Sequence, residues 1–148
     1  MSQILSKVLS KQNIVTQLES ESKSQAIIRA GNLLASSGFV EEAYIEKMLE
    51  REEITTTFIG SGLAIPHGTK EGKVYVKKTG IVFLQYPEGL DFGNGNIAYL
   101  VIGIAALGDE HMDILMNVAE AVSDAEDLEK LKSTSDVDQI YALLSQSN

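Results

Sequence analysis

The chain of 148 residues contains no cysteine, and it has only two histidines and two prolines. Without cysteine, a disulfide framework, a thiolate metal site and a thiol nucleophile are all excluded. No apolar run reaches the roughly 18 residues that a membrane-spanning helix needs. The N-terminal segment MSQILSKVLSKQ alternates polar with apolar residues and lacks the apolar core of a signal peptide. We therefore expect a cytoplasmic protein with no direct membrane insertion.

Positive charge is also scarce, with 12 lysines and arginines against 21 acidic residues and a net charge of −9. Nucleic acid and anionic lipid repel an acidic protein, so both are poor candidates as partners. Lysines gather only at positions 70, 73, 77 and 78, shortly after the first histidine. We interpret each of these lysines as part of a solvated surface.

Five helices are predicted from apolar residues at helical spacing, over residues 22–38, 41–52, 109–122, 125–132 and 136–146. Ser22 and Gln25 match the S-x-x-Q capping box, and Gly38 is placed to end the same helix in a left-handed conformation. Asp109 and Ser135 are predicted to cap the third and the last helix. The first dozen residues form a loose arm or a short helix.

Strands are predicted over residues 13–16, 55–59, 79–86 and 97–105. The last two are nearly continuous apolar runs, which suit strands covered on both faces. Between them, Pro87-Glu88-Gly89 and Asn94-Gly95 supply turn residues. We expect residues 1–148 to form a single layered α/β domain, in which helices flank a mixed parallel and antiparallel sheet of about five strands.

The segment GLAIPHGT holds His67 between Pro66 and Gly68. Proline restricts the backbone on one side of the histidine, and glycine permits unusual backbone angles on the other. A neutral imidazole is a fair nucleophile near physiological pH. Taken alone this is a weak signal, because many loop histidines have no chemical role.

His111 is predicted in the first turn of the third helix, close to the apolar residues Ile114 and Leu115. It should therefore lie at the edge of the core, beside a helix N-terminus that favours anions. The competing interpretation is a structural histidine bonded to a backbone carbonyl.

Arg51 lies at the end of the second helix, where its guanidinium could bind two oxygens of a phosphate. The competing interpretation is an ion pair with Glu52 or Glu53, or a contact with the C-terminus of its own helix.

Together, the two histidines and the arginine indicate a site for a transferred phosphoryl group, in which positioning and charge stabilisation carry the reaction. The chain has neither a G-x-x-x-x-G-K-[ST] motif nor a G-x-G-x-x-G motif, so a nucleotide is not predicted. No H-x-x-x-H pair or clear third ligand supports a metal site. We expect no cofactor, and we expect the phosphate to arrive on another protein.

The segments GSGLAIPHGT, AYIEKMLEREEITTTFIGSGLAIPHGT and PEGLDFGNGNIAYLVIGIAALGDEHMDIL resemble the IIA component of the phosphoenolpyruvate-dependent sugar phosphotransferase system, mannitol/fructose class. The likeness covers nearly the whole chain and is greatest to mannitol-specific members. It implies that His67 is phosphorylated through Nε2 by phospho-HPr and passes the group to a cysteine of the IIB domain of a mannitol IIBC permease. It also implies that Arg51 and His111 support the phosphoryl group.

Two alternatives keep the fold and change the role. One is a regulatory IIA of the nitrogen-related branch, which acts by binding target proteins. The other is a non-enzymatic interaction domain of a transcription regulator. For the carrier, we expect brief docking of partners on a small, partly polar surface whose apolar rim includes Leu63 or Ile65.

Overall fold

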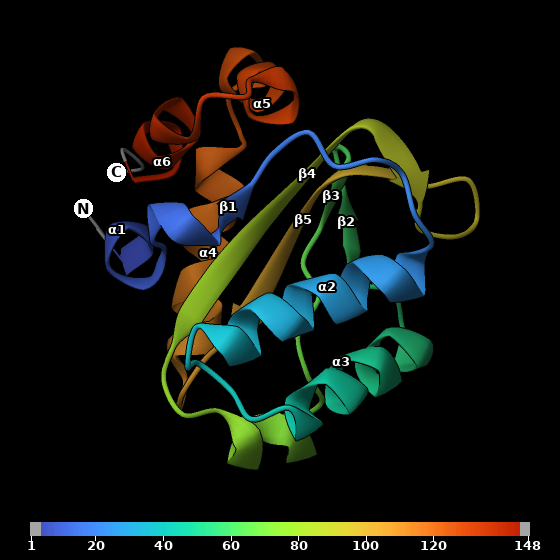
Figure 1. The fold of residues 1–148 in the computed structure, drawn as a ribbon, viewed down its shortest axis with the longest axis vertical. Helices are drawn as coiled ribbons and strands as arrows, with labels where there is room; N and C mark the ends of the chain where they lie inside the picture. The colour runs from blue at the N-terminus through green and yellow to red at the C-terminus, as the bar shows by residue number, and fades with distance from the viewer. Residues whose placement is uncertain (1–3, 146–148) are drawn as a thin grey trace.

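The computed structural model describes residues 4–145, which build a five-stranded mixed sheet between two layers of helices (Figure 1). The strand order is β1-β4-β5-β3-β2. The strands are β1 (Ile14–Val15), β2 (Phe58–Gly60), β3 (Leu63–Ala64), β4 (Gly80–Asp91) and β5 (Ile97–Ala105). The neighbours β1/β4 and β3/β5 are parallel, whereas β4/β5 and β2/β3 are antiparallel. The predicted mixed α/β sheet is therefore confirmed.

The helices divide between the two faces of the sheet (Figure 1). One face is covered by α2 (Lys23–Ser36) and α3 (Ala43–Ile54), and the other by α1 (Ile4–Val8), α4 (Glu110–Ala121), α5 (Ala125–Ser133) and α6 (Val137–Ser145). Two short 3₁₀ helices lie in the connections: η1 (Lys11–Asn13) between α1 and β1, and η2 (Glu71–Tyr75) between β3 and β4. Residue 146 of the last predicted helix lies outside the described residues. No helix within residues 4–145 has the length and apolar character that crossing a bilayer requires.

Alternation along the long strands separates two hydrophobic cores. In β4, Val82 and Leu84 pack toward α2 and α3, whereas Ile81 and Phe83 pack toward α1, α4, α5 and α6. All four side chains are fully buried. Because both faces are covered, residues 80–84 of the strand carry no polar side chain, in agreement with the nearly continuous apolar run in the sequence.

β4 is longer than predicted. Residues 87–89, which we expected to form a turn, lie inside the strand, where the pairing with β5 shifts register between Gln85 and Leu90. Proline has no backbone N–H to donate to the neighbouring strand. In the irregular stretch of β4, the residue at position 87 does not need to donate one. The turn prediction for Pro87-Glu88-Gly89 was therefore wrong, whereas β5 occupies the predicted range of 97–105.

The helix caps follow the predictions in part. Ser22 Oγ accepts from the backbone N–H of Gln25 at 3.1 Å and Gln25 Oε1 accepts from that of Ser22 at 3.0 Å, which completes the capping box. Gly38 has a φ of +85° and ends α2 as predicted. Asp109 precedes α4, but its side chain makes no capping hydrogen bond. The prediction that it accepts from the helix was wrong.

The cap of α6 is one residue later than predicted. Asp136 Oδ1 accepts from the backbone N–H groups of Asp138 at 3.0 Å and of Gln139 at 3.3 Å. Ser135 was therefore the wrong cap. Aspartate serves equally well in this role, and Asp136 directly precedes the first residue of α6.

Gln85 is a fully buried polar side chain in the middle of β4. Its Oε1 accepts from the backbone N–H and the side-chain amide of Gln17, at 3.0 and 2.9 Å. Its Nε2 donates to the carbonyls of Leu131 and Thr134, at 2.8 and 2.7 Å. One amide therefore ties the end of α5 and the segment after β1 to the sheet, and it does so with every polar atom bonded.

The change Gln85→Leu should lower the free energy of unfolding by about 2–4 kcal/mol, because an apolar side chain of similar size cannot bond the backbone N–H of Gln17 or the carbonyls of Leu131 and Thr134. Urea unfolding followed by circular dichroism measures the change. Gln12→Leu, at an exposed position of η1, is the control and should change stability by less than about 0.5 kcal/mol. A loss below about 1 kcal/mol for Gln85→Leu would show that water replaces the amide.

Candidate active site

His67 is held against the end of the central strand β5. It follows β3 and forms a parallel bridge with Ile104, whose N–H donates to the Pro66 carbonyl at 2.9 Å. The backbone of the Pro-His-Gly segment is thus an extension of the sheet. This explains the stiff frame around the histidine, because strand pairing fixes the position of its Cα.

Gly68 serves a steric purpose that the sequence did not reveal. It is not among the glycines with positive φ, so the expected conformational freedom is not used. A Cβ built on Gly68 would lie 2.5 Å from Tyr44 Cε1. The Tyr44 hydroxyl accepts from the Gly68 N–H at 2.8 Å and donates to the Ile104 carbonyl at 2.9 Å. Glycine at 68 therefore makes room for the tyrosine that joins the histidine turn to β5.

The His67 ring presents one nitrogen to the pocket. Its Nδ1 lies 2.8 Å from the Ile65 carbonyl oxygen, which only accepts, so Nδ1 carries the proton and donates. In the neutral ring, Nε2 then keeps its lone pair. Burial is the main cause that lowers the pKa of His67, and the Arg51 charge lowers it further against opposing effects of the Ile65 carbonyl and Glu52. The ring is therefore neutral and nucleophilic at physiological pH.

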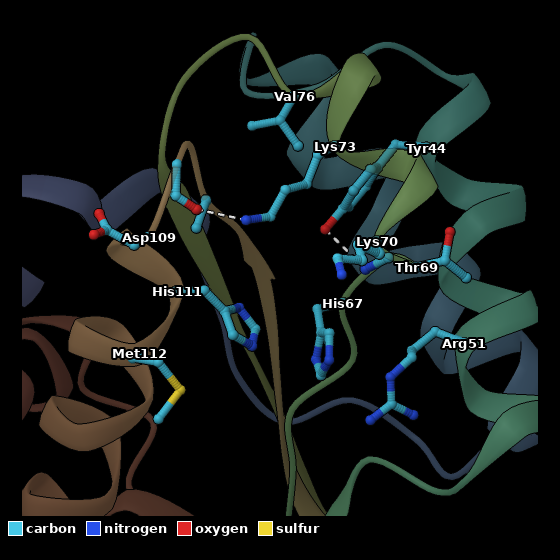
Figure 2. Close-up of a pocket in the computed structure, with 13 residues that line it drawn as sticks. Tyr44, Arg51, His67, Thr69, Lys70, Lys73, Val76, Asp109, His111 and Met112 are labelled. Carbon is cyan, nitrogen blue, oxygen red and sulfur yellow. Dashed lines mark hydrogen bonds between the residues drawn. The ribbon is translucent and has the colours of Figure 1, made fainter.

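His111 projects from the first turn of α4 toward His67 (Figure 2). The two ring centroids are 4.6 Å apart with an interplanar angle of 61°. Burial, followed by the charges of His67, Lys73 and Arg51, lowers the pKa of His111 to about 4. His111 is thus neutral and half-buried at the edge of the core, and it lies beside the His67 ring.

Arg51 projects from the last turn of α3 into the same pocket (Figure 2). Its Nη1 donates to the Thr55 carbonyl at 2.6 Å, just beyond the end of the helix. The alternative of an ion pair with Glu52 is wrong, because the Glu52 carboxylate is buried and bonded to Thr56 and Thr57. The carbonyl contact positions one nitrogen of the guanidinium.

The three predicted residues therefore converge on one open pocket of about 400 Å³ (Figure 2). Thr69, Lys70 and Lys73 also line it, and Lys73 Nζ donates to the Gly108 carbonyl. The pocket combines a nucleophilic nitrogen with several cationic groups, an arrangement that suits a bound phosphoryl group. Within residues 4–145, no group of three or more histidine, aspartate and glutamate side chains comes together as a metal site.

Three contributors escaped the sequence analysis. Tyr44 received no role from the sequence, because its hydrogen bond to the Ile104 carbonyl spans 60 residues. Lys73 was interpreted as solvated surface, although it lines the pocket. Glu52 was considered only as a partner for Arg51, yet two threonines at i+4 and i+5 gave a local signal for a different role.

The chain is similar to known proteins of a phosphotransferase system, in agreement with a pocket that suits a phosphoryl group. Residues 7–147 match the family "Phosphoenolpyruvate-dependent sugar phosphotransferase system, EIIA 2". The chain is 45% identical over 141 residues to the mannitol-specific phosphotransferase enzyme IIA component of Bacillus subtilis, covering 95% of this chain and 99% of that protein.

Two solved structures have the same fold. The complex of enzyme IIAMTL and phosphorylated enzyme IIBMTL from Escherichia coli matches with a TM-score of 0.89 and 42% identity, over 93% of this chain and 96% of that one. The nitrogen regulatory protein IIA-Ntr from Neisseria meningitidis matches with a TM-score of 0.82 and 27% identity, over 95% and 99% of the two chains. Identity is thus higher to these two mannitol proteins than to this nitrogen regulatory protein.

Proposed function

The chain belongs to the phosphoenolpyruvate-dependent sugar phosphotransferase system EIIA 2 family, and we propose that it is a mannitol-type phosphocarrier. In this proposal, residues 1–148 form a single cytoplasmic IIA domain. His67 accepts a phosphoryl group from phospho-HPr and passes it to the cysteine of the IIB domain of a mannitol permease. No cofactor takes part.

The transfer needs one reactive nitrogen on this chain. Nε2 of His67 attacks phosphorus, the bond between phosphorus and the donor's histidine nitrogen breaks, and the electron pair returns to that nitrogen. In the second step, the IIB thiolate attacks phosphorus and the pair of the N–P bond returns to Nε2. The proton on Nδ1 stays in place throughout, donated to the Ile65 carbonyl.

The observation that carries the proposal is the hydrogen bond of 2.8 Å between His67 Nδ1 and the Ile65 carbonyl. It leaves Nε2 unprotonated and aims it into a pocket that contains Arg51 and His111. Arg51 stabilises the charge on the phosphoryl oxygens, and the neutral His111 offers them a hydrogen bond. One arginine and one neutral histidine stabilise the phosphoryl group only moderately. This suits a phosphohistidine that must pass its phosphoryl group on to the next protein.

The regulatory alternative has weaker support. The chain is 45% identical to a mannitol-specific IIA component but 27% identical to a nitrogen regulatory IIA. The same pocket would suit either role, so the distinction depends on where the phosphoryl group goes next.

Following labelled phosphate from phosphoenolpyruvate tests the function directly. The protein is mixed with enzyme I, HPr and a mannitol IIB domain, and label is measured on each. We expect label to appear on this chain and then on IIB. Label that stays on this chain would favour the regulatory branch, and no label on it would favour an interaction domain.

The apolar rim of the pocket differs from the prediction. Leu63 is 0% exposed and Ile65 is 6% exposed, so neither can contact a partner. Both belong to the core under α4, because β3 pairs with β5 at the centre of the sheet. The exposed apolar side chain on the pocket is Met112, at 59%, with Met116 one turn further along α4 at 65%.

The change Met112→Glu should slow phosphorylation by phospho-HPr about tenfold, because a charge replaces apolar contact area beside the reactive ring. The thermal midpoint should stay the same, since the side chain is exposed. Rates of label uptake at several HPr concentrations provide the measurement. Ile28→Glu, at a partly exposed apolar position on α2, is the control, and equal rates for the two variants would remove Met112 from the docking surface.

A further inference from the structure

We infer that the buried carboxylate of Glu52 is a positioning residue for phosphoryl transfer: it fixes the short segment that orients both His67 and Arg51. The kinetic part of this inference rests on the proposed function. The geometric part stands on the hydrogen bonds that connect Glu52 to the two site residues.

The Glu52 carboxylate lies in the interior at the end of α3, with 4% of its side chain accessible. Its Oε1 accepts from the backbone N–H of Thr57 at 2.9 Å and from the Thr57 hydroxyl at 2.6 Å. Its Oε2 accepts from the Thr56 hydroxyl at 2.5 Å and lies 3.6 Å from Lys23 Nζ. Because a buried carboxylate is unfavourable unless donors surround it, this convergence of donors is what allows it to remain there.

A continuous set of hydrogen bonds runs from Glu52 to the reactive ring. The Thr57 carbonyl accepts from the Ile65 N–H at 3.0 Å, and the Ile65 carbonyl accepts from His67 Nδ1 at 2.8 Å. The carboxylate therefore fixes Thr57, Thr57 fixes Ile65, and Ile65 holds the proton on Nδ1. A displacement of Thr57 would move the carbonyl that selects the tautomer of His67.

The same segment sets the position of the arginine. Arg51 precedes Glu52 in the last turn of α3, and its Nη1 donates to the Thr55 carbonyl at 2.6 Å. Residues 55–57 are thus hydrogen-bonded by two consecutive side chains: Arg51 binds them on the pocket side, and Glu52 binds them on the core side. Glu52 thereby fixes the guanidinium and the imidazole relative to each other.

An apolar side chain could fill the space of Glu52, but it could not accept these donors. The backbone N–H of Thr57 is buried, since the residue is 3% exposed, and it would lose its partner. The Thr56 hydroxyl accepts from the Phe58 N–H at 3.2 Å, so its own proton is directed to Glu52. The carboxylate therefore matches a segment that presents only donors toward it.

The experiment compares Glu52→Ala with the wild type by ¹⁵N NMR of histidine and by the rate of phosphorylation from phospho-HPr. We expect His67 of the variant to shift from the Nδ1–H tautomer toward the Nε2–H tautomer, which leaves no lone pair on the attacking nitrogen. The rate of phosphorylation should fall at least about tenfold. Glu52→Gln keeps an acceptor oxygen for Thr57, so it should restore the tautomer and bring the rate within about threefold of the wild type.

Glu53→Gln, at the exposed neighbouring position, is the matched control and should change neither readout. A folded Glu52→Ala protein with the wild-type tautomer, or with a shifted tautomer and the wild-type rate, would overturn the inference. If Glu52→Ala does not fold, the variant Thr57→Val is used in its place, because it removes the hydrogen bond from the Thr57 hydroxyl to Glu52 and keeps the side-chain shape. An unchanged His67 tautomer and an unchanged rate in Thr57→Val would then overturn the inference. A wild-type protein that takes no label would contradict the proposed function and leave the NMR result readable.

Discussion

His67→Gln is expected to take no label from phospho-HPr, a loss of at least about a thousandfold in rate. Glutamine occupies a similar volume and places an amide nitrogen near the position of Nε2. Its lone pair is delocalised into the carbonyl, so it cannot attack phosphorus. The effect should be this large because, in the proposal, His67 is the group of this chain that forms a bond to phosphorus.

Label uptake from phosphoenolpyruvate, enzyme I and HPr measures this loss, and circular dichroism checks the fold. His111→Gln serves as the comparison, since it removes the second imidazole from the pocket and leaves His67 in place. It should slow the uptake and still reach full labelling. Full labelling of His67→Gln together with none of His111→Gln would exchange the roles of the two rings.

Arg51→Ala should lower the rate of phosphorylation about 100- to 1,000-fold while leaving the labelled site unchanged. The guanidinium is the planar cation of the pocket and can contact two phosphoryl oxygens at once. Arg51→Lys should recover part of the rate, because it restores the charge without the paired geometry. Single-turnover uptake in a rapid-quench instrument resolves these differences.

Arg29→Ala is the control for loss of a positive charge elsewhere. Arg29 lies on α2, is exposed and pairs with Glu21, at 2.8 Å between Nε and Oε2. It should transfer at the wild-type rate. If Arg51→Ala transfers as fast as Arg29→Ala, then Arg51 only terminates its helix through the Thr55 carbonyl, and the charge stabilisation falls to Lys73 and Lys70.

The sequence predicted the elements that depend on local signals. β5 was placed at residues 97–105 because its apolar run is bounded by turn residues, and the cap of α2 was read from Ser22 and Gln25. β3 was missed because a two-residue strand exists only through pairing with β5. The extension of β4 through Pro87 was missed because Pro87-Glu88-Gly89 is typical of a turn. These residues join the strand only through an irregular pairing with β5, which the sequence does not show.

The candidate site divides in the same way. His67, His111 and Arg51 were singled out by their residue types and predicted positions, and the family resemblance then implied their roles. The structure brings the three residues into one pocket. Leu63 was assigned to the surface because sequence alone does not tell which side of a turn becomes the centre of a sheet. Tyr44 was missed because its partners are Gly68 and Ile104, and only the fold brings them together.

Because Gly68 and Tyr44 are in close contact, a substitution at one of these positions depends on the residue at the other. A methyl group at 68 would overlap a ring that two hydrogen bonds prevent from moving away. A library randomised at position 68 alone should therefore return glycine. In a library randomised at positions 44 and 68 together, other residues at 68 should survive only in clones where position 44 has also become smaller. Tuning of this pocket by evolution or by design must then pass through paired substitutions at these two positions.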